Sequence, residues 1–155
     1  MKAFTRLILF TGCVSTVMFC GCATPYQKMG LTGGFRDKQL EPGVYSVLFA
    51  GNGYINPNTV SKYMLYRTAE ITVENGYDYF AFIMDRGRTD VTWTYVGNGI
   101  SVAVPKPSSE GIFRVFKGEK PGNYPDAIKA QEVIDKLKPE IEKPRRDHSV
   151  PTKAK

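Results

Sequence analysis

The chain has 155 residues, a formal net charge of +6 at pH 7 and one histidine. This length supports one domain with a single core and does not support two. His148 lies in a basic, proline-containing C-terminal stretch, which argues against a histidine-based catalytic triad or metal site. We therefore expect a protein with no catalytic residues, no metal and no cofactor.

The first 22 residues have the pattern of a signal peptide followed by a lipidation site. A basic start precedes an apolar run, and Gly21 is the small residue that a signal peptidase needs before its cut. The uncharged stretch 7–22 spans about 24 Å as a helix, which is short against a hydrocarbon core of about 30 Å. We predict a signal peptide over 1–21, cleavage between Gly21 and Cys22, and a lipid on Cys22.

The tetrad Phe19-Cys20-Gly21-Cys22 resembles the bacterial lipobox, with Phe where Leu is usual and Cys where Ala or Ser is usual. Cys13 is a rival acceptor, but its use would leave barely half of the apolar run. Acyl chains contribute roughly 0.8 kcal/mol per buried methylene, so attachment through Cys22 would be effectively permanent. Ala23 stands where lipoproteins retained in the inner membrane carry Asp; by resemblance to that sorting rule, we expect the periplasm-facing inner leaflet of the outer membrane.

Residues 22–42 contain several glycines and prolines and lack sustained periodicity. We predict that they form a lipidated N-terminus and a flexible tether, which would hold the domain about 25 Å from the bilayer. The domain itself is predicted over 43–141, and a basic disordered tail over 142–155. Because the basic residues cluster near this tail, we expect no nucleic-acid partner.

The first elements of the domain have clear local signals. The apolar run 44–50 predicts a strand, and Gly51-Asn52-Gly53 predicts a turn after it. Asn56-Pro57 is typical of a helix start, with Asn as the cap and Pro in the first turn. Apolar spacings of three and four follow as far as Asn75-Gly76, which predicts one amphipathic helix.

The second half of the domain is rich in strand formers. We predict strands over 77–84, 91–95, 100–104 and 112–116, with a polar connection over 85–90, a turn at Gly97-Asn98-Gly99 and a strand end at Pro105-Lys106-Pro107. A second helix is predicted after Pro125-Asp126, with Ile128, Val133, Ile134, Leu137 and Ile141 on one side. The order β-α-β-β-β-β-α favours an α+β fold, a two-layer sandwich in which two helices cover one face of an antiparallel-dominated sheet of about five strands.

Several short motifs resemble those of an uncharacterised family of small bacterial lipoproteins, first catalogued from Caulobacter. These are the GCATPYQ start at Gly21, followed by TGGF, GNGY and an RxAE…NGYxYF core. The resemblance implies lipidation and a periplasmic location, and it supplies no catalytic residues. It directs attention to Arg67 and Glu70, which lie three residues apart on one helical face and can pair.

The remaining polar motifs can each be explained by an ordinary structural role. Asp85 and Asp90 are a conceivable carboxylate pair, but Arg86 and Arg88 interleave with them, as expected of a solvated connection. The turn around Asn52 precedes a helix and can in principle receive an anion, yet it lacks the third glycine and the lysine of phosphate-binding loops. Exposed tyrosines or Trp93 could also form a flat binding surface, although most aromatic residues should be core.

The sequence favours a non-enzymatic lipoprotein that acts through protein or envelope contacts, in assembly, structural support or stress sensing. Its expected partners are the membrane, through the lipid on Cys22, and an envelope protein or peptidoglycan. Covalent attachment of the terminal Lys155 to peptidoglycan, as in the murein lipoprotein, is a minor alternative. A hydrolase would need a nucleophile and base that the sequence does not reveal. The main alternative is a periplasmic module that binds a small molecule or anion through Asn52, Arg67, Glu70, Asp85, Arg86, Arg88 and Asp90.

Overall fold

The computed structural model describes residues 22–97 and 100–143. The predicted signal peptide, Cys13 and Cys20, and all but the first two residues of the predicted tail lie outside these ranges. The described elements are β1 (Gly34–Glu41), β2 (Val44–Ala50), α1 (Pro57–Glu74), β3 (Tyr79–Gly97), β4 (Ile100–Phe116), β5 (Ile128–Lys129) and α2 (Ala130–Ile141).

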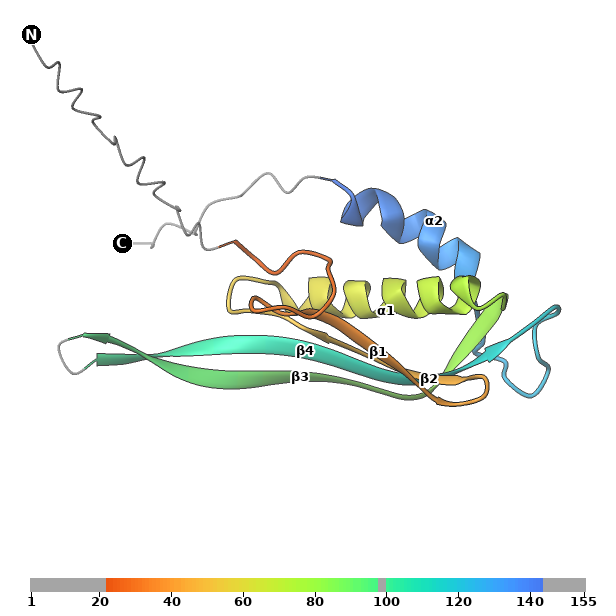
Figure 1. Ribbon diagram of the computed structural model, residues 1–155, viewed down its shortest axis with the longest axis horizontal. Coiled ribbons are helices and arrows are strands. Elements are labelled where there is room, and N and C mark those ends of the chain that lie inside the picture. The colour runs from red at the N-terminus through yellow and green to blue at the C-terminus, as the bar shows by residue number, and fades with distance from the viewer. Residues whose placement is uncertain (1–21, 98–99, 144–155) are drawn as a thin grey trace, which may run out of the picture.

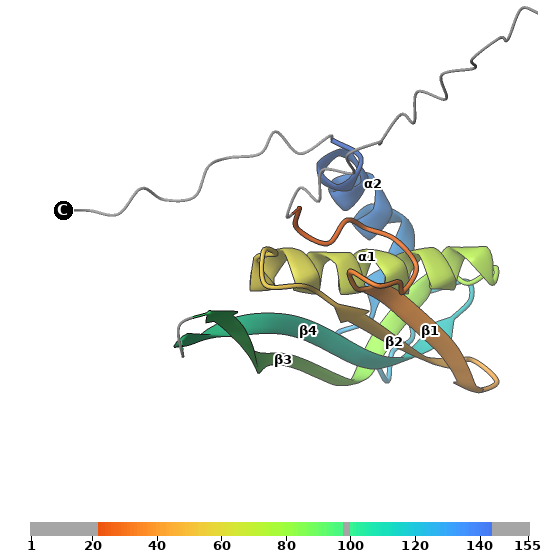
Figure 2. The ribbon, with the colours of Figure 1, turned by 60° about the vertical axis from the view of Figure 1, so that its left-hand side comes forward.

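The strands form one five-stranded antiparallel sheet in the order β1-β2-β4-β3-β5 (Figure 1). Both helices lie on the same side of it, with α1 next to the sheet and α2 on the outer side of α1 (Figure 2). This arrangement confirms the predicted α+β sandwich. The core fills the space between α1 and the sheet, where Phe49, Phe80 and Phe113 are completely buried.

Helix α1 begins and ends as its sequence predicts. The side-chain oxygen of Asn56 accepts a hydrogen bond from the backbone N–H of Asn58 at 2.8 Å, and Pro57 occupies the first turn. At the other end Gly76 has a φ of +75°, the left-handed conformation in which glycine commonly ends a helix.

The prediction of a flexible tether over 22–42 is wrong, because this segment is part of the folded domain. Thr24 is completely buried, and β1 pairs with β2 along its length. Only the first two residues of β1 are buried, so this edge strand carries no alternating hydrophobic pattern that sequence reasoning can detect. The folded domain therefore includes the segment 22–42.

The predicted polar connection over 85–90 and the strand end at Pro105–Pro107 are also wrong, since β3 and β4 run through both segments. The backbone oxygen of Pro107 accepts a hydrogen bond from Gly51, so residue 107 turns its backbone groups toward the edge facing β2. Pro105, two residues away, turns its backbone groups the same way. Both missing N–H groups therefore lie away from β3, and the pairing between β3 and β4 is preserved.

The observed order is β-β-α-β-β-β-α. Four predicted strands merge into the two long strands β3 and β4, while β1 and β5 come from segments predicted as tether and helix. Ile128, predicted on the second helix, lies in β5 and is exposed. Strand β5 pairs only with Tyr79 and Phe80 and places α2 against α1.

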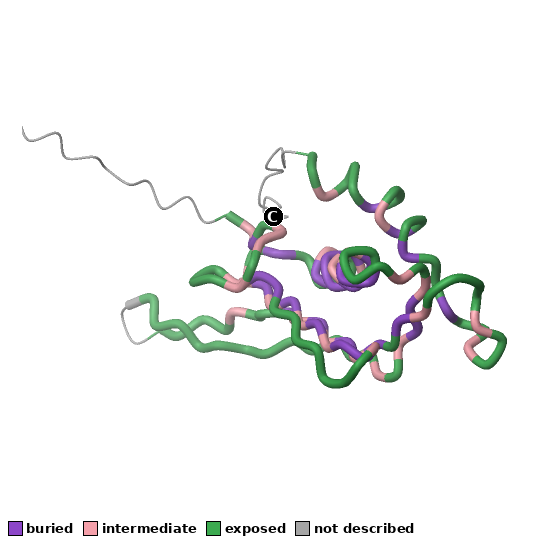
Figure 3. Tube along the Cα trace, turned by 45° about the vertical axis from the view of Figure 1, so that its right-hand side comes forward, coloured by how far each residue is buried: buried purple, intermediate pink, exposed green. Residues whose placement is uncertain are grey.

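The pairing of β2 with β4 ends where Ala50 lies opposite Ser108. Beyond this point β3 and β4 continue as a two-stranded hairpin over 89–97 and 100–107, which we call the arm. The arm projects past the helices, and its residues are mostly exposed (Figures 1 and 3).

Candidate functional site

The predicted lipidation residue lies at the point where the chain enters the folded domain. Cys22 is exposed, and its backbone oxygen accepts a hydrogen bond from the Asn52 side-chain amide at 2.8 Å. The backbone N–H of Asn52 donates to the Thr24 hydroxyl at 2.9 Å, and the N–H of Thr24 donates to Asn52 Oδ1 at 3.3 Å. These three residues, Cys22, Thr24 and Asn52, form an N-terminal clamp.

The glycines that flank this region allow the close crossing of the N-terminal segment and the sheet. Gly33 has a φ of +102°, and a Cβ there would lie 2.3 Å from the backbone oxygen of Ala50. A Cβ on Gly34 would lie 2.5 Å from the backbone oxygen of Gln27. Side chains cannot be accommodated at either position without moving backbone, so the TGGF motif has a structural role here.

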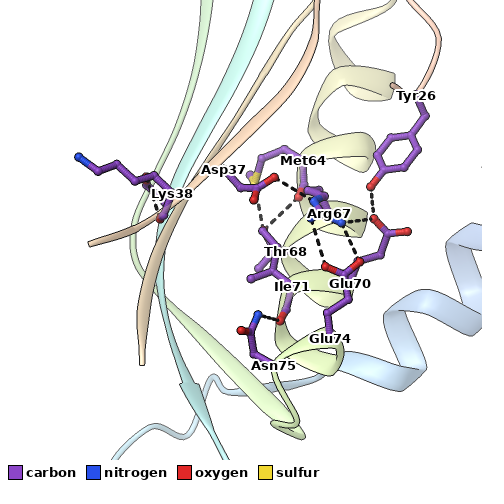
Figure 4. A network of polar contacts seen from close by, with 11 residues as sticks. Tyr26, Asp37, Lys38, Met64, Arg67, Thr68, Glu70, Ile71, Glu74 and Asn75 are labelled. Atoms are coloured by element: carbon purple, nitrogen blue, oxygen red, sulfur yellow. Dashed lines mark hydrogen bonds and ion pairs between the residues drawn. The ribbon is translucent and has the colours of Figure 1, made fainter. Parts of the chain in front are cut away.

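Tyr26 anchors the N-terminal segment on α1. Its ring packs against Phe35, Tyr63 and Tyr66, with ring centroids 5.0 to 5.4 Å apart. Its hydroxyl donates a hydrogen bond to the carboxylate of Glu70 (Figure 4). Ring packing and this charge-assisted hydrogen bond together fix the segment between the clamp and β1.

Arg67 is the centre of a polar network, and the predicted pair with Glu70 is confirmed (Figure 4). Its Nη1 donates to Glu70 Oε2 and to Glu74 Oε1, each at 3.0 Å, and its Nε donates to Asp37 Oδ1 at 3.1 Å. The guanidinium carbon also lies 4.8 Å from the centre of the Phe35 ring. One side chain therefore joins α1 to β1 and, through Glu70, to Tyr26.

Burial and neighbouring charges shift the pKa values of two members of this network, Arg67 and Tyr26. Burial lowers the pKa of the Arg67 guanidinium, but the hydrogen bonds to Glu74, Glu70 and Asp37 outweigh it and raise the pKa above its usual value. Burial, and then the hydrogen bond to Glu70, raise the pKa of the Tyr26 hydroxyl far above its usual value. Arg67 stays charged and Tyr26 stays neutral, as the network requires.

Sequence reasoning found Arg67 and Glu70 but missed the other members of the network. Glu74 lies seven residues after Arg67 on the same helix, a spacing that places both on one face. Tyr26 and Asp37 come from the segment predicted as a tether, and no local signal in the sequence connects them to α1. Because three carboxylates already bind Arg67, its guanidinium is not available to an anionic ligand.

The other predicted binding residues lie elsewhere, on the exposed part of β3. Arg88 Nε contacts Asp90 Oδ1 at 2.8 Å, and Arg86 lies opposite Glu110 in the pairing with β4. Near Gly87 and Arg88 there is a pocket of about 150 Å³ between β3, β4 and the start of α1. Sites for small ligands usually measure about 300 Å³ or more. The structure thus divides the predicted binding residues among the clamp, the Arg67 network and the β3 surface.

The arm carries the largest group of exposed apolar side chains among the described residues. No Asp, Glu, Lys or Arg occurs between positions 91 and 105. Trp93, the single tryptophan of the chain, is 69% exposed, and Tyr95 is 67% exposed. The other exposed apolar residues of the arm are Val91, Val96, Ile100 and Val102. An apolar surface of this kind is typical of an interaction site.

Comparisons with protein-family models, with curated proteins and with solved structures found no match. Membership of the lipoprotein family therefore stays a prediction, based on the motifs quoted above. Within residues 22–97 and 100–143, no cluster of three or more His, Cys, Asp or Glu side chains is placed to hold a metal ion. None of the helices in those ranges combines the length and the hydropathy that a membrane crossing requires.

Proposed function

We propose that the protein is a lipoprotein anchored through Cys22, periplasmic and attached to the inner leaflet of the outer membrane, which acts through contacts and not through catalysis. The observation that carries this proposal is the position of Cys22. It is exposed, whereas Thr24, two residues further on, is completely buried and held by Asn52. The predicted acceptor is thus accessible, although it lies two residues from a completely buried position.

This arrangement changes the expected distance between domain and membrane. Two extended residues span at most about 7 Å, compared with the roughly 25 Å of a flexible tether of 20 residues. A lipid on Cys22 would therefore hold the domain directly at the surface of the bilayer. The domain would consequently be held against the bilayer with a restricted orientation, because the clamp fixes the anchor point relative to the sheet.

A role in contacts agrees with the polar and apolar surfaces. The charged groups first considered for chemistry have partners within the fold: Arg67 binds three carboxylates, and Arg88 binds Asp90. The arm, in contrast, exposes apolar side chains along a strand whose outer edge has no neighbouring strand within residues 22–97 and 100–143. We therefore propose the arm as the contact surface, and we do not retain the anion-binding alternative.

The anchor is tested by metabolic labelling with palmitate and membrane fractionation of cells that express the wild-type chain, Cys22→Ser or Cys13→Ser. We expect Cys22→Ser to lose the label and leave the membrane fraction, while Cys13→Ser keeps both properties. Continued labelling of Cys22→Ser would assign the lipid to another residue. Loss of labelling in Cys13→Ser alone would refute the proposed anchor.

A further inference from the structure

The outer edge of β3 is open over most of its length among the described residues. In the sheet β3 lies between β4 and β5, but β5 pairs only with Tyr79 and Phe80. From Ala81 to Gly97 the outer edge of β3 therefore has no neighbouring strand among the described residues. The opposite edge of the arm, on β4, contains Pro105 and Pro107, which lack the N–H groups that a neighbouring strand would need. Only the β3 edge is suited to strand addition.

The direction of the backbone groups on this edge follows from the pairing. Successive residues of a strand direct their backbone N–H and C=O groups to opposite edges. Because Pro107 directs its groups away from β3, the even-numbered residues of β4 on either side of it direct theirs toward β3. Arg88 and Asp90 lie opposite Ser108 and Lys106, and they use their backbone groups in that ladder. Beyond the register shift between Phe82 and Met84, the odd-numbered residues of β3 from Asp85 to Tyr95 therefore present their N–H and C=O groups to the open edge.

The charges on β3 favour one way in which two such edges can pair. If two copies of β3 met antiparallel with Arg88 at the centre, the two Arg88 side chains would oppose each other; with Asp90 at the centre, the two Asp90 side chains would. With Gly87 at the centre, Arg86 would oppose Arg88 of the other copy. With Thr89 at the centre, Arg88 lies opposite Asp90 twice, and no like charges meet. Centres from Val91 onward also avoid like charges, but they bring no opposite charges together.

We propose that the protein forms a two-fold symmetric dimer in which two β3 strands pair antiparallel, centred on Thr89, to make one continuous sheet. The partner of the arm is then a second copy of the chain. The proposal rests on the proposed function only in treating the arm as a contact surface. Each Arg88–Asp90 pair joins its symmetry mate, and Val91 of one copy lies opposite Gly87 of the other. The two-fold axis of an antiparallel strand pair is perpendicular to the sheet, so helices and clamps of both copies lie on the same side. Two anchors at Cys22 can then reach one membrane.

Charge exchange tests the interface, using the full chain carrying Cys22→Ser so that no lipid contributes. We expect sedimentation equilibrium to show a dimer, and Arg88→Asp or Asp90→Arg to weaken association at least about tenfold, because each single change opposes like charges twice. The double variant should recover the dimer. Arg86→Gln, whose residue faces Thr92 in this register, is the matched control and should associate as the parent does.

The register is tested separately by crosslinking. In the proposed pairing, the two Thr89 Cα atoms lie about 5.5 Å apart, within the range that a disulfide can bridge. Thr89→Cys should form a covalent dimer on oxidation with copper phenanthroline, whereas the two Thr92→Cys positions would be about 20 Å apart and should not. Crosslinking of Thr92→Cys in preference to Thr89→Cys would overturn the register.

A chain that stays monomeric at every accessible concentration would overturn the proposal, as would a dimer that Arg88→Asp leaves unchanged. The fluorescence of Trp93 distinguishes a rival partner. A monomer whose emission shifts to shorter wavelength with vesicles of phosphatidylglycerol and phosphatidylethanolamine would assign the arm to a lipid surface instead. If the chain forms the dimer but Cys22→Ser keeps the palmitate label, the proposed anchor is refuted and the proposed dimer is not.

Discussion

The side-chain amide of Asn52 binds the backbone oxygen of Cys22 at 2.8 Å, across 30 positions of the sequence. The same side chain accepts hydrogen bonds from the backbone N–H groups of Thr24 and Tyr54. A residue in the turn between β2 and α1 therefore fixes the position of Cys22 on the domain. If Cys22 carries a lipid, Asn52 also sets the position of the domain relative to the membrane.

Replacing Asn52 with Ala should release the first residues without unfolding the domain. The change removes three hydrogen bonds and leaves the N–H of buried Thr24 without its acceptor, which costs about 1–3 kcal/mol. We expect faster hydrogen exchange at Thr24 and faster proteolysis near the N-terminus. Asn123→Ala, in an exposed loop, is the control. Equal exchange at Thr24 in both variants would show that the clamp contributes nothing.

The close approach of Gly33 to the backbone of Ala50 predicts that a side chain at position 33 destabilises the fold. Gly33→Ala would place a methyl group 2.3 Å from the oxygen of Ala50 at a residue whose φ is +102°. The combined clash and backbone strain should lower the free energy of unfolding by at least about 2 kcal/mol in urea titrations. Gly122→Ala has open space and should stay within about 0.5 kcal/mol of the parent. Similar values for the two variants would contradict the role of the crossing.

Arg67 should be far more important for stability than an ordinary surface arginine. Arg67→Ala removes a mostly buried cation and leaves three partly exposed carboxylates close together without it, so we expect a loss of about 2 kcal/mol in the free energy of unfolding. Arg67→Lys should be intermediate, because an ammonium group lacks the planar fork that serves several partners. Lys138→Ala, from an exposed pair with Glu142, should cost less than about 1 kcal/mol. An Arg67→Ala variant as stable as Lys138→Ala would be inconsistent with the network.

The raised pKa of Tyr26 predicts a loss of stability at alkaline pH. Because the pKa in the folded state lies above the unfolded value of about 10, the contribution of Tyr26 is complete below that pH and is lost as the pH rises above it. Tyr26→Phe cannot ionise, so its free energy of unfolding should decline less than that of the parent between about pH 9 and about pH 11. Tyr54→Phe, at an exposed site, should decline as the parent does. Parallel curves for all three proteins would contradict the prediction.

The parts of the structure that could be predicted from the sequence depend on neighbouring residues. The cap at Asn56, the end of α1 at Gly76 and the pair of Arg67 and Glu70 all lie within one or two helical turns of their partners. Strand β2 was likewise predictable from its own hydrophobic run. In each case the interaction that stabilises the element is local.

The missed parts depend on contacts between distant segments. Tyr26 meets Glu70 across 44 positions, and Asp37 meets Arg67 across 30, so neither appears in any local pattern. Strand β3 passes through the charged residues 85–90 because their side chains are exposed, and β4 passes through two prolines because both turn their backbone groups away from β3. Local sequence rules predict a loop at these positions, but pairing between β3 and β4 extends the strands through them.

The anchor at Cys22 is the central claim, and the mass of the mature N-terminus tests it most directly. The protein is extracted from bacterial membranes, digested, and its N-terminal peptide is analysed by mass spectrometry. The account predicts a peptide that starts at Cys22 and carries the added mass of a diacylglycerol group. A mature protein that starts at another residue, or an unmodified peptide that reads through Gly21 into Cys22, would contradict it.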